Sequence, residues 1–278
     1  MIIDTHTHFY DPSRPQGVPW PSPKEDWLYR RVLPEHYQAL ARPEGVGGTV
    51  VVEASAWLED NQWVLDLAAA DPFILGLVGH LDPGTEAFAG QLERFAANPL
   101  FRGIRVGFRQ GMDQGAFLAD MELLAKRDLE LDVIMGYEHL GEVARLAERL
   151  PELRIVINHV GSVPIDGTAP DPGWVEAMQR AAAHPLVFCK VSGMAELSQV
   201  QPAPADLGFY TPVLDVLWAV FGPERLIYGS NWPVCERAAQ YAQVQAVATP
   251  YFAAKGEAAL EQFLWKNALA AYQCALPQ

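Results

Sequence analysis

The chain begins with two histidines whose spacing suits joint chemistry. Its first residues read Ile2-Ile3-Asp4-Thr5-His6-Thr7-His8-Phe9, an apolar start that predicts a short strand. Side chains alternate faces along a strand, so His6 and His8 point to the same side, with Asp4 behind them. Two imidazoles at one strand end form half of a metal site or half of an acid/base site. The alternative interpretation is that they only cap an edge strand.

Further polar residues stand at or just after the ends of other apolar runs. The set is Glu53, His80, Arg105 with Arg109, His139, His159, Lys190 and Asn231. If these runs are parallel strands, their ends lie on one face, which is where barrel enzymes form active sites. The pattern therefore predicts one site built from residues far apart in the sequence. Within the set, we interpret His80 as structural.

Each of these residues has a functional and a structural interpretation. His159 either acts in the site or caps its strand. A buried Glu53 needs a metal, an arginine or a backbone amide as its partner. Arg105 either grips a substrate carboxylate with both branches of its guanidinium or forms an ion pair with Glu53. Lys190 either faces the site or pairs with a carboxylate, and His139 either reaches the site or lies past the rim in solvent.

Alternating strand and helix patterns must position these side chains. Strands are expected over residues 2–9, 49–53, 73–79, 101–106, 131–135, 154–159, 186–191 and 225–231. Helices are expected over residues 60–70, 85–97, 116–127, 140–150, 173–183 and 211–221, with a helical region from about 240 to 275. A loop rich in proline and tryptophan covers residues 11–27 and is either a pocket wall or a surface wrap.

Eight strands, seven of them followed by a clear helix, predict an α/β fold with parallel strands. We expect a (β/α)8 TIM barrel that forms a single domain over residues 1–278. The main rival is a doubly wound open sheet. It is disfavoured because no Gly-x-Gly-x-x-Gly follows the first strand.

Composition narrows the class of protein. The 278 residues are 50% hydrophobic and carry a formal net charge of −14, with 20 Lys and Arg. This balance argues against nucleic acid or a membrane surface as the partner, and a small-molecule substrate is expected. Three widely spaced cysteines, no signal peptide and no apolar run of membrane length favour the cytoplasm. A homo-oligomer remains open.

Three motifs resemble those of the amidohydrolase superfamily. They are Asp4-Thr5-His6-Thr7-His8-Phe9, Asn158-His159-Val160-Gly161 and Gly229-Ser230-Asn231-Trp232-Pro233-Val234. The chain looks most like the amidohydrolase-2 group, which includes sugar-acid lactonases and 2-pyrone-4,6-dicarboxylate lactonase. The resemblance runs along nearly the whole chain. The three motifs in this order and spacing are fairly specific for the superfamily and less so for a substrate.

The resemblance implies a role for each matching residue. His6 and His8 would bind one Zn²⁺ or another divalent ion, or would polarise the substrate carbonyl in members that need no metal. His159 would hydrogen-bond the carbonyl or ring oxygen. Arg105 would grip a carboxylate or hydroxyl groups, with help from Lys190.

Asn231 departs from the family pattern, which usually has Asp in this motif. An amide cannot take a proton from water and is a poor ligand for a catalytic metal. Another group must then act as base, with Glu53 and His159 the candidates, or the activity is weak or of another kind. Strand four also carries Arg105 where two-metal members use a bridging lysine, which disfavours a two-metal site.

The leading hypothesis is hydrolysis of a small lactone of the sugar-acid or pyrone carboxylate type. Water would attack a carbonyl polarised by the histidines, with Trp20 or Trp232 as a pocket wall. A second hypothesis is a decarboxylase of a small unsaturated or aromatic acid. The third is a barrel that binds a small acid without turning it over, because Asn231 replaces Asp.

Overall fold

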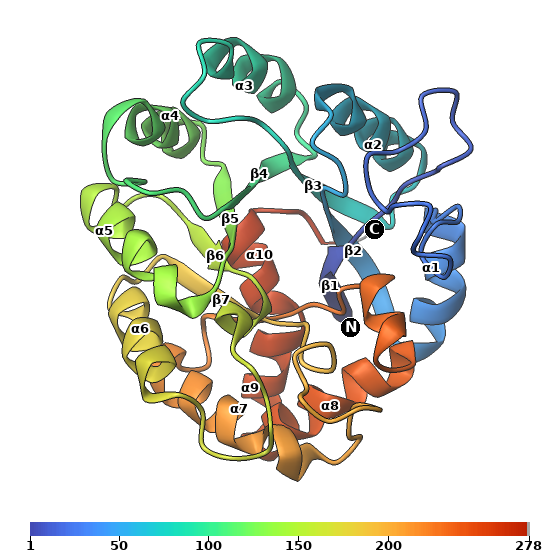
Figure 1. Ribbon diagram of the computed structural model, residues 1–278, viewed down its shortest axis with the longest axis vertical. Coiled ribbons are helices and arrows are strands. Elements are labelled where there is room, and N and C mark those ends of the chain that lie inside the picture. The colour runs from blue at the N-terminus through green and yellow to red at the C-terminus, as the bar shows by residue number, and fades with distance from the viewer. Residues whose placement is uncertain (277–278) are drawn as a thin grey trace.

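The expected (β/α)8 barrel is confirmed by the computed structural model, which describes residues 1–276 (Figure 1). Each strand pairs in parallel with the next along the chain. The strands are β1 Ile2–Thr7, β2 Val46–Val52, β3 Ile74–Gly79, β4 Phe101–Gly107, β5 Glu130–Ile134, β6 Ile155–Ile157, β7 Val187–Val191 and β8 Leu226–Tyr228.

Helices surround the strands, most of them as an outer ring, while the last one lies across the end of the barrel where the strands begin (Figure 1). They are α1 Pro34–Ala41, α2 Leu58–Ala70, α3 Phe88–Ala96, α4 Gly115–Lys126, α5 Gly141–Arg149, α6 Pro172–Ala182, α7 Leu207–Phe221, α8 Tyr241–Ala254, α9 Glu257–Glu261 and α10 Asn267–Tyr272. A π-helical turn, Gln262–Lys266, joins α9 to α10. Within residues 1–276, no helix combines the length and the apolar character that crossing a membrane requires.

Two features of the helical ring were not expected from the sequence. Helix α1 is an additional element after the expected loop of residues 11–27, in a segment for which no element was predicted. It is short and weakly amphipathic, and Pro34 occupies its first turn, where a missing N–H costs nothing. Helix α7 begins at Leu207 rather than at residue 211, because Pro212 lies inside the helix instead of opening it.

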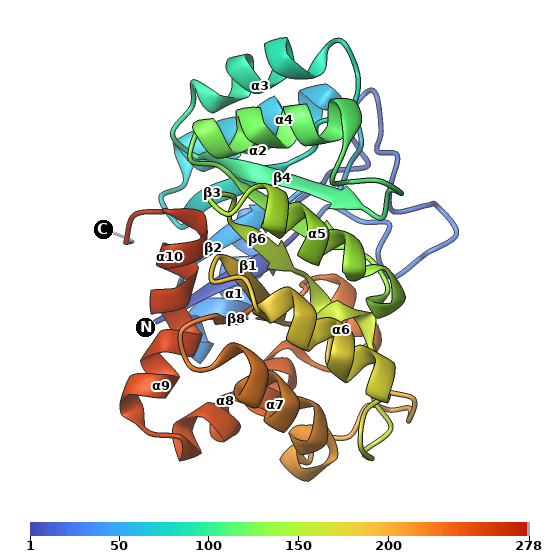
Figure 2. The same cartoon turned by 90° about the vertical axis from the view of Figure 1, so that its left-hand side faces the viewer.

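The hydrophobic core has an inner and an outer part. The inner part fills the barrel with strand residues such as Ile3, Val50, Val156 and Ile227. At the end where the strands begin, Tyr272 of α10 closes this inner part. Figure 2 shows α10 on the side where the strands begin, while the strand arrows point to the opposite side. The outer part lies between the strands and the helical ring. The open end of the barrel is therefore the carboxyl end of its strands.

Side chains close the barrel between its first and last strands. Thr5 Oγ1 donates to the carbonyl oxygen of Tyr228 at 2.7 Å, and the backbone N–H of Ser230 donates to Asp4 Oδ1 at 2.9 Å. Just beyond β1, the N–H of His8 donates at 2.9 Å to a backbone carbonyl after β8. These bonds replace the regular ladder of the other strand pairs, so the seam depends on particular residues.

Asp4 ties this seam to the helical ring. Its Oδ1 also accepts the backbone N–H of His6, and its Oδ2 accepts the hydroxyl of Tyr37 on α1 at 2.6 Å. The strand pairing is irregular between Asp4 and Thr7. Through this irregularity Asp4 turns toward α1 while His6 faces the barrel interior.

We predict that Asp4→Ala destabilises the protein strongly. The substitution removes the acceptor shared by four donors, two of them backbone N–H groups, at about 1–3 kcal/mol for each donor left unpaired. The free energy of unfolding, measured by urea denaturation, should fall by about 3 kcal/mol or more. Asp26→Ala is the matched control, because Asp26 is exposed. Equal stabilities of the two variants would contradict the role assigned to Asp4.

Candidate active site

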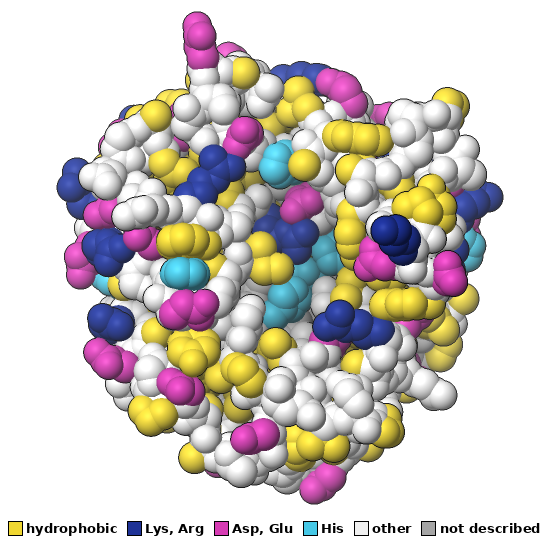
Figure 3. Space-filling model, viewed as in Figure 1, with side chains coloured by type: hydrophobic (Ala, Val, Ile, Leu, Met, Phe, Trp, Pro, Cys, Tyr) yellow, Lys and Arg dark blue, Asp and Glu magenta, His cyan; other side chains and the backbone are white. Residues whose placement is uncertain are grey.

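A cavity of about 390 Å³ opens at the carboxyl ends of the strands. Its wall includes His8, Trp20, Arg105, His159, Glu196 and Asn231. Figure 3 views this face and shows histidine side chains gathered in a central hollow, beside basic and acidic groups. Parallel strands thus bring residues from the two ends and the middle of the sequence to one place.

The structure brings most of the expected site residues to this cavity or directly beneath it. Five of them, His8, His159, Asn231, Arg105 and Trp20, are on its wall. His6 and Lys190 lie below them, fully buried. Glu53 lies beside Arg105 and lines two smaller neighbouring cavities.

His139 and Trp232 do not reach the cavity wall. A short 3-10 turn after β5, Tyr137–His139, carries His139 past the rim. Its ring stacks on Phe108 there, with 3.7 Å between ring centroids. Trp232 is fully buried and donates its Nε1–H to Glu236 at 2.8 Å. Asn231 has a positive φ of 62°, and this turn directs Asn231 to the cavity and Trp232 into the core.

The three histidines form a compact cluster. The His6 ring lies 5.0 Å from that of His8 and 4.4 Å from that of His159, between centroids. Burial lowers the pKa of His8 to about 3, with a further contribution from Arg105. Burial also lowers the pKa values of His6 and His159 well below the ordinary value, with added repulsion from Lys190 and Arg105. All three imidazoles are therefore neutral near pH 7.

Hydrogen bonds fix the proton positions of two of these rings. His8 Nδ1 lies 2.9 Å from the carbonyl oxygen of Val52. Because a carbonyl only accepts, His8 carries its proton on Nδ1 and keeps a free lone pair on Nε2. His6 Nδ1 lies 3.3 Å from Lys190 Nζ, which only donates, so neutral His6 carries its proton on Nε2.

The loop after β7 packs closely against the His159 ring and holds it in place. Its Nδ1 lies 2.8 Å from Ser192 Oγ, just after β7. The next residue, Gly193, has a φ of +67°, and a Cβ there would lie 3.0 Å from His159 Nδ1. A side chain at position 193 would both strain the backbone and push the ring away. The glycine thus lets the β7 loop pack directly on the imidazole.

Lys190 anchors the floor of the site. Its ammonium forms an ion pair with Asp132 at 2.7 Å and donates to the carbonyl oxygen of Thr5 at 2.9 Å. The hydroxyl of Tyr272 donates to the other oxygen of Asp132 at 3.0 Å. Burial lowers the pKa of Lys190, and the Asp132 carboxylate opposes that effect. The pair is buried and hydrogen-bonded on both sides, as a charge inside a protein must be.

The donor set does not fit the divalent ion that the family resemblance implies at His6 and His8. A metal-bound histidine normally donates its second ring N–H to a carbonyl or carboxylate. His8 meets this condition, but His6 faces the Lys190 ammonium and keeps its proton on Nε2, the nitrogen that a metal would need. Across residues 1–276, no three His, Cys, Asp or Glu side chains are arranged to hold an ion.

Arg105 is paired with Glu53. Its Nε donates to Glu53 Oε1 at 2.8 Å, and its Nη2 donates to the carbonyl oxygen of the same residue at 2.8 Å. This is the structural alternative that the sequence left open. The ion pair orients the guanidinium while Arg105 still lines the cavity. Glu53 in turn is committed to Arg105, which leaves it poorly placed to act as a base.

Glu196 is a site residue that the sequence reasoning missed. It lies in the loop after β7 and lines the cavity. Its Oε1 accepts Nδ2–H of Asn231 at 2.7 Å, and its Oε2 has no partner among residues 1–276. Burial raises the pKa of Glu196, although the bond from Asn231 opposes this. The available signal was a carboxylate shortly after a strand end, the same pattern that pointed to Glu53.

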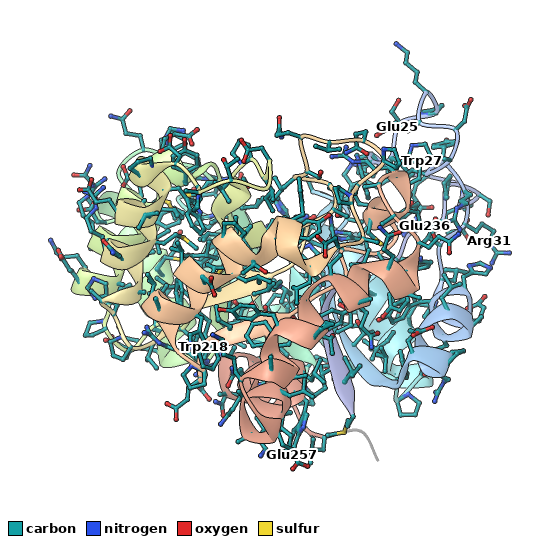
Figure 4. The ribbon with its side chains drawn as sticks, turned by 90° about the horizontal axis from the view of Figure 1, so that it is seen from below. Glu25, Trp27, Arg31, Trp218, Glu236 and Glu257 are labelled. Carbon is teal, nitrogen blue, oxygen red and sulfur yellow. The ribbon has the colours of Figure 1, made fainter. Side chains whose placement is uncertain are left out.

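The proline-rich loop forms one wall of the site. The Trp20 ring lies 5.9 Å from the His8 ring between centroids. The loop is held at one end by the Arg14–Asp60 ion pair and at the other by Arg30, which binds Glu236 beyond β8. Figure 4 shows Glu236 on the same side of the molecule as the labelled loop residues, away from Trp218 and Glu257.

Comparisons with known proteins agree with this geometry. A family model described as amidohydrolase matches residues 3–274. An L-fucono-1,5-lactonase from Burkholderia ambifaria is 33% identical over 244 residues, 86% of this chain and 82% of that protein. An L-fucono-1,5-lactonase from Burkholderia multivorans is 29% identical over 291 residues, 100% of this chain and 97% of that protein.

A solved structure supports the same relationship. It is an amidohydrolase from Burkholderia multivorans with bound zinc, 25% identical, with a TM-score of 0.86 over 99% of this chain and 100% of that one. The family match spans nearly the whole sequence, and His8 of the first motif lies on the cavity wall at the barrel mouth. The chain therefore belongs to the amidohydrolase family.

Proposed function

We propose that this protein hydrolyses a small lactone of the sugar-acid type. The observation that carries the proposal is the cavity wall itself, where the neutral imidazoles of His8 and His159 lie with the guanidinium of Arg105. Such a wall can hold water and stabilise negative charge on a carbonyl oxygen without a charged nucleophile. The curated relatives named L-fucono-1,5-lactonase support a lactone as substrate.

Each residue has a role in this reaction. The free Nε2 lone pair of His8 accepts a hydrogen bond from the attacking water. The carbonyl oxygen of the lactone faces Arg105, whose positive charge favours the developing oxyanion, and His159 lies beside it. His6 and Lys190 act from beneath by fixing the positions of these rings.

The cavity suits a single hydroxylated ring. Its volume is at the small end of the range for ligand sites. Trp20 and Leu197 supply apolar wall, against which a sugar ring packs, and Ser162 and Asn231 supply hydrogen-bonding groups for hydroxyls. Because Arg105 is already paired with Glu53, the interior favours an uncharged lactone over a dicarboxylate.

We further propose that hydrolysis does not require a metal. If a divalent ion were held at His6 and His8, it would act as a Lewis acid on the carbonyl. The proton on His6 Nε2 and the ammonium behind it oppose such binding. The residues above supply the reaction without it.

A panel of lactones tests both proposals. Purified protein should hydrolyse aldono-1,4- and aldono-1,5-lactones, measured by proton release, faster than 2-pyrone-4,6-dicarboxylate. Incubation with EDTA followed by dialysis should change the rate by less than about twofold, and added Zn²⁺ should not raise it. Absence of hydrolysis across the panel would refute the lactonase proposal. Carbon dioxide release from an aromatic acid would favour the decarboxylase alternative, and a metal requirement would refute the metal-free mechanism.

Replacement of Asn231 by Asp separates an active enzyme from a disabled binding barrel. A disabled barrel should gain activity when the usual aspartate is restored. In this structure, however, Asn231→Asp removes the donor to Glu196 and sets two carboxyl groups in contact. We therefore expect kcat/KM at pH 7 to fall by about tenfold or more, because like charges in contact raise one pKa by a unit or more. A higher rate in the variant would support the disabled barrel instead.

A further inference from the structure

We propose that Glu196 is the catalytic residue that transfers protons in this reaction, and that Asn231 is the residue that positions it. The assignment rests on the proposed lactone hydrolysis. It explains which group acts as the base when asparagine replaces aspartate at position 231. In this chain the carboxyl group needed for proton transfer stands in the loop after β7 instead of at the end of β8.

The geometry gives the two oxygens of Glu196 different tasks. Oε1 is held by Asn231 Nδ2 at 2.7 Å. Oε2 is shielded from solvent and has no hydrogen-bond partner among the described residues, so it exchanges a proton with water once the carboxyl group turns toward the cavity that Glu196 lines. An unpartnered buried oxygen costs about 1–3 kcal/mol. Such a group in a folded protein calls for an explanation, and a catalytic role is one.

Asn231 links Glu196 to the histidine that holds water. Its side chain interacts with the His8 ring and opposes the fall in the His8 pKa. The left-handed backbone of Asn231, with a φ of 62°, turns its side chain to the cavity. Asparagine tolerates this conformation better than most residues. The amide of Asn231 thus lies between the carboxyl group of Glu196 and the His8 ring.

The surroundings of Glu196 suit a general base. Burial raises the pKa of its carboxyl group, and a carboxylate with a raised pKa is a stronger base than an ordinary one. The other titratable groups around it are Tyr210 on α7, and Cys235 and Arg237 in the turn after β8. Arg237 lowers the Glu196 pKa only weakly, so the effect of burial prevails.

The two bases expected from the sequence are poorer candidates. Glu53 is bound to Arg105 and lines other cavities. His159 lines the cavity, but its pKa is well below the ordinary value, which makes its imidazole a weak base. Glu196 alone among these three combines a free oxygen with raised basicity.

In the proposed reaction, Glu196 moves one proton from water to the ring oxygen of the lactone. Glu196 Oε2 takes a proton from water as the water oxygen bonds to the carbonyl carbon, whose π electrons move to the carbonyl oxygen. The tetrahedral intermediate collapses, the bond between the carbonyl carbon and the ring oxygen breaks, and Glu196 returns its proton to that oxygen. The product is a hydroxy acid, which then loses its acidic proton to solvent.

The test compares Glu196→Gln with the exposed control Glu152→Gln, each as the full chain. Glutamine keeps the shape of the side chain but cannot accept a proton from water. We expect kcat for the best lactone of the panel to fall by about a hundredfold to ten-thousandfold in Glu196→Gln, with KM little changed. Thermal melting, followed by circular dichroism, should match the wild type in both variants.

The pH profile gives a readout that a structural role would not move. A base must be ionised, so wild-type kcat/KM should fall with decreasing pH below a pKa higher than that of an ordinary glutamate. This limb should persist in Glu152→Gln and vanish in Glu196→Gln.

Chemical rescue gives a second readout. In Glu196→Ala the removed carboxyl group leaves space beside the cavity. Added formate should raise the rate of Glu196→Ala by at least about tenfold, and chloride at equal ionic strength should not raise it. Formate should have no effect on the wild type.

The outcomes separate the two proposals. No hydrolysis by the wild type would overturn the lactonase function, and the Glu196 assignment with it. Hydrolysis by the wild type with an unchanged pH limb in Glu196→Gln would overturn the assignment of Glu196 alone, as would failure of formate to rescue a folded Glu196→Ala.

Discussion

Closure of the barrel between β1 and β8 is the constraint on which the site depends. The strand that carries His6, with His8 just beyond its end, meets the loop that carries Asn231 along this seam. Side chains close the seam, chiefly Asp4 and Thr5, so the same residues determine the fold and the placement of the histidines. A shift of the seam would separate the imidazoles from the amide opposite them.

Two cationic side chains of the site are each paired with a carboxylate. One buried ammonium, Lys190, is matched by Asp132 and directs the proton of His6. Arg105 is matched by Glu53 at the cavity wall. The imidazoles between these pairs stay neutral because burial and the nearby cations disfavour their protonation. A neutral lactone thus meets a wall of oriented dipoles and the guanidinium of Arg105, which Glu53 holds in place.

Much of the fold and part of the site follow from the sequence. Runs of β-branched residues and their spacing predict the eight strands, and the positions of His8, Arg105 and His159 at strand ends predict their convergence. Features that depend on local backbone turns could not be predicted from the sequence. The left-handed turn at Asn231 sends Trp232 into the core. Glu196 is held at the cavity by a contact with Asn231, 35 residues away in the sequence.

Closure of the seam also determines when the active site can form during synthesis and folding. Its bonds join residues 223 and 226 positions apart, nearly the full length of the chain. Contacts at such separation form late, because a large loss of chain entropy precedes them. During synthesis the N-terminal strand leaves the ribosome long before its last partner exists. A nascent chain therefore has no assembled centre, and catalytic competence arrives only with the final strand.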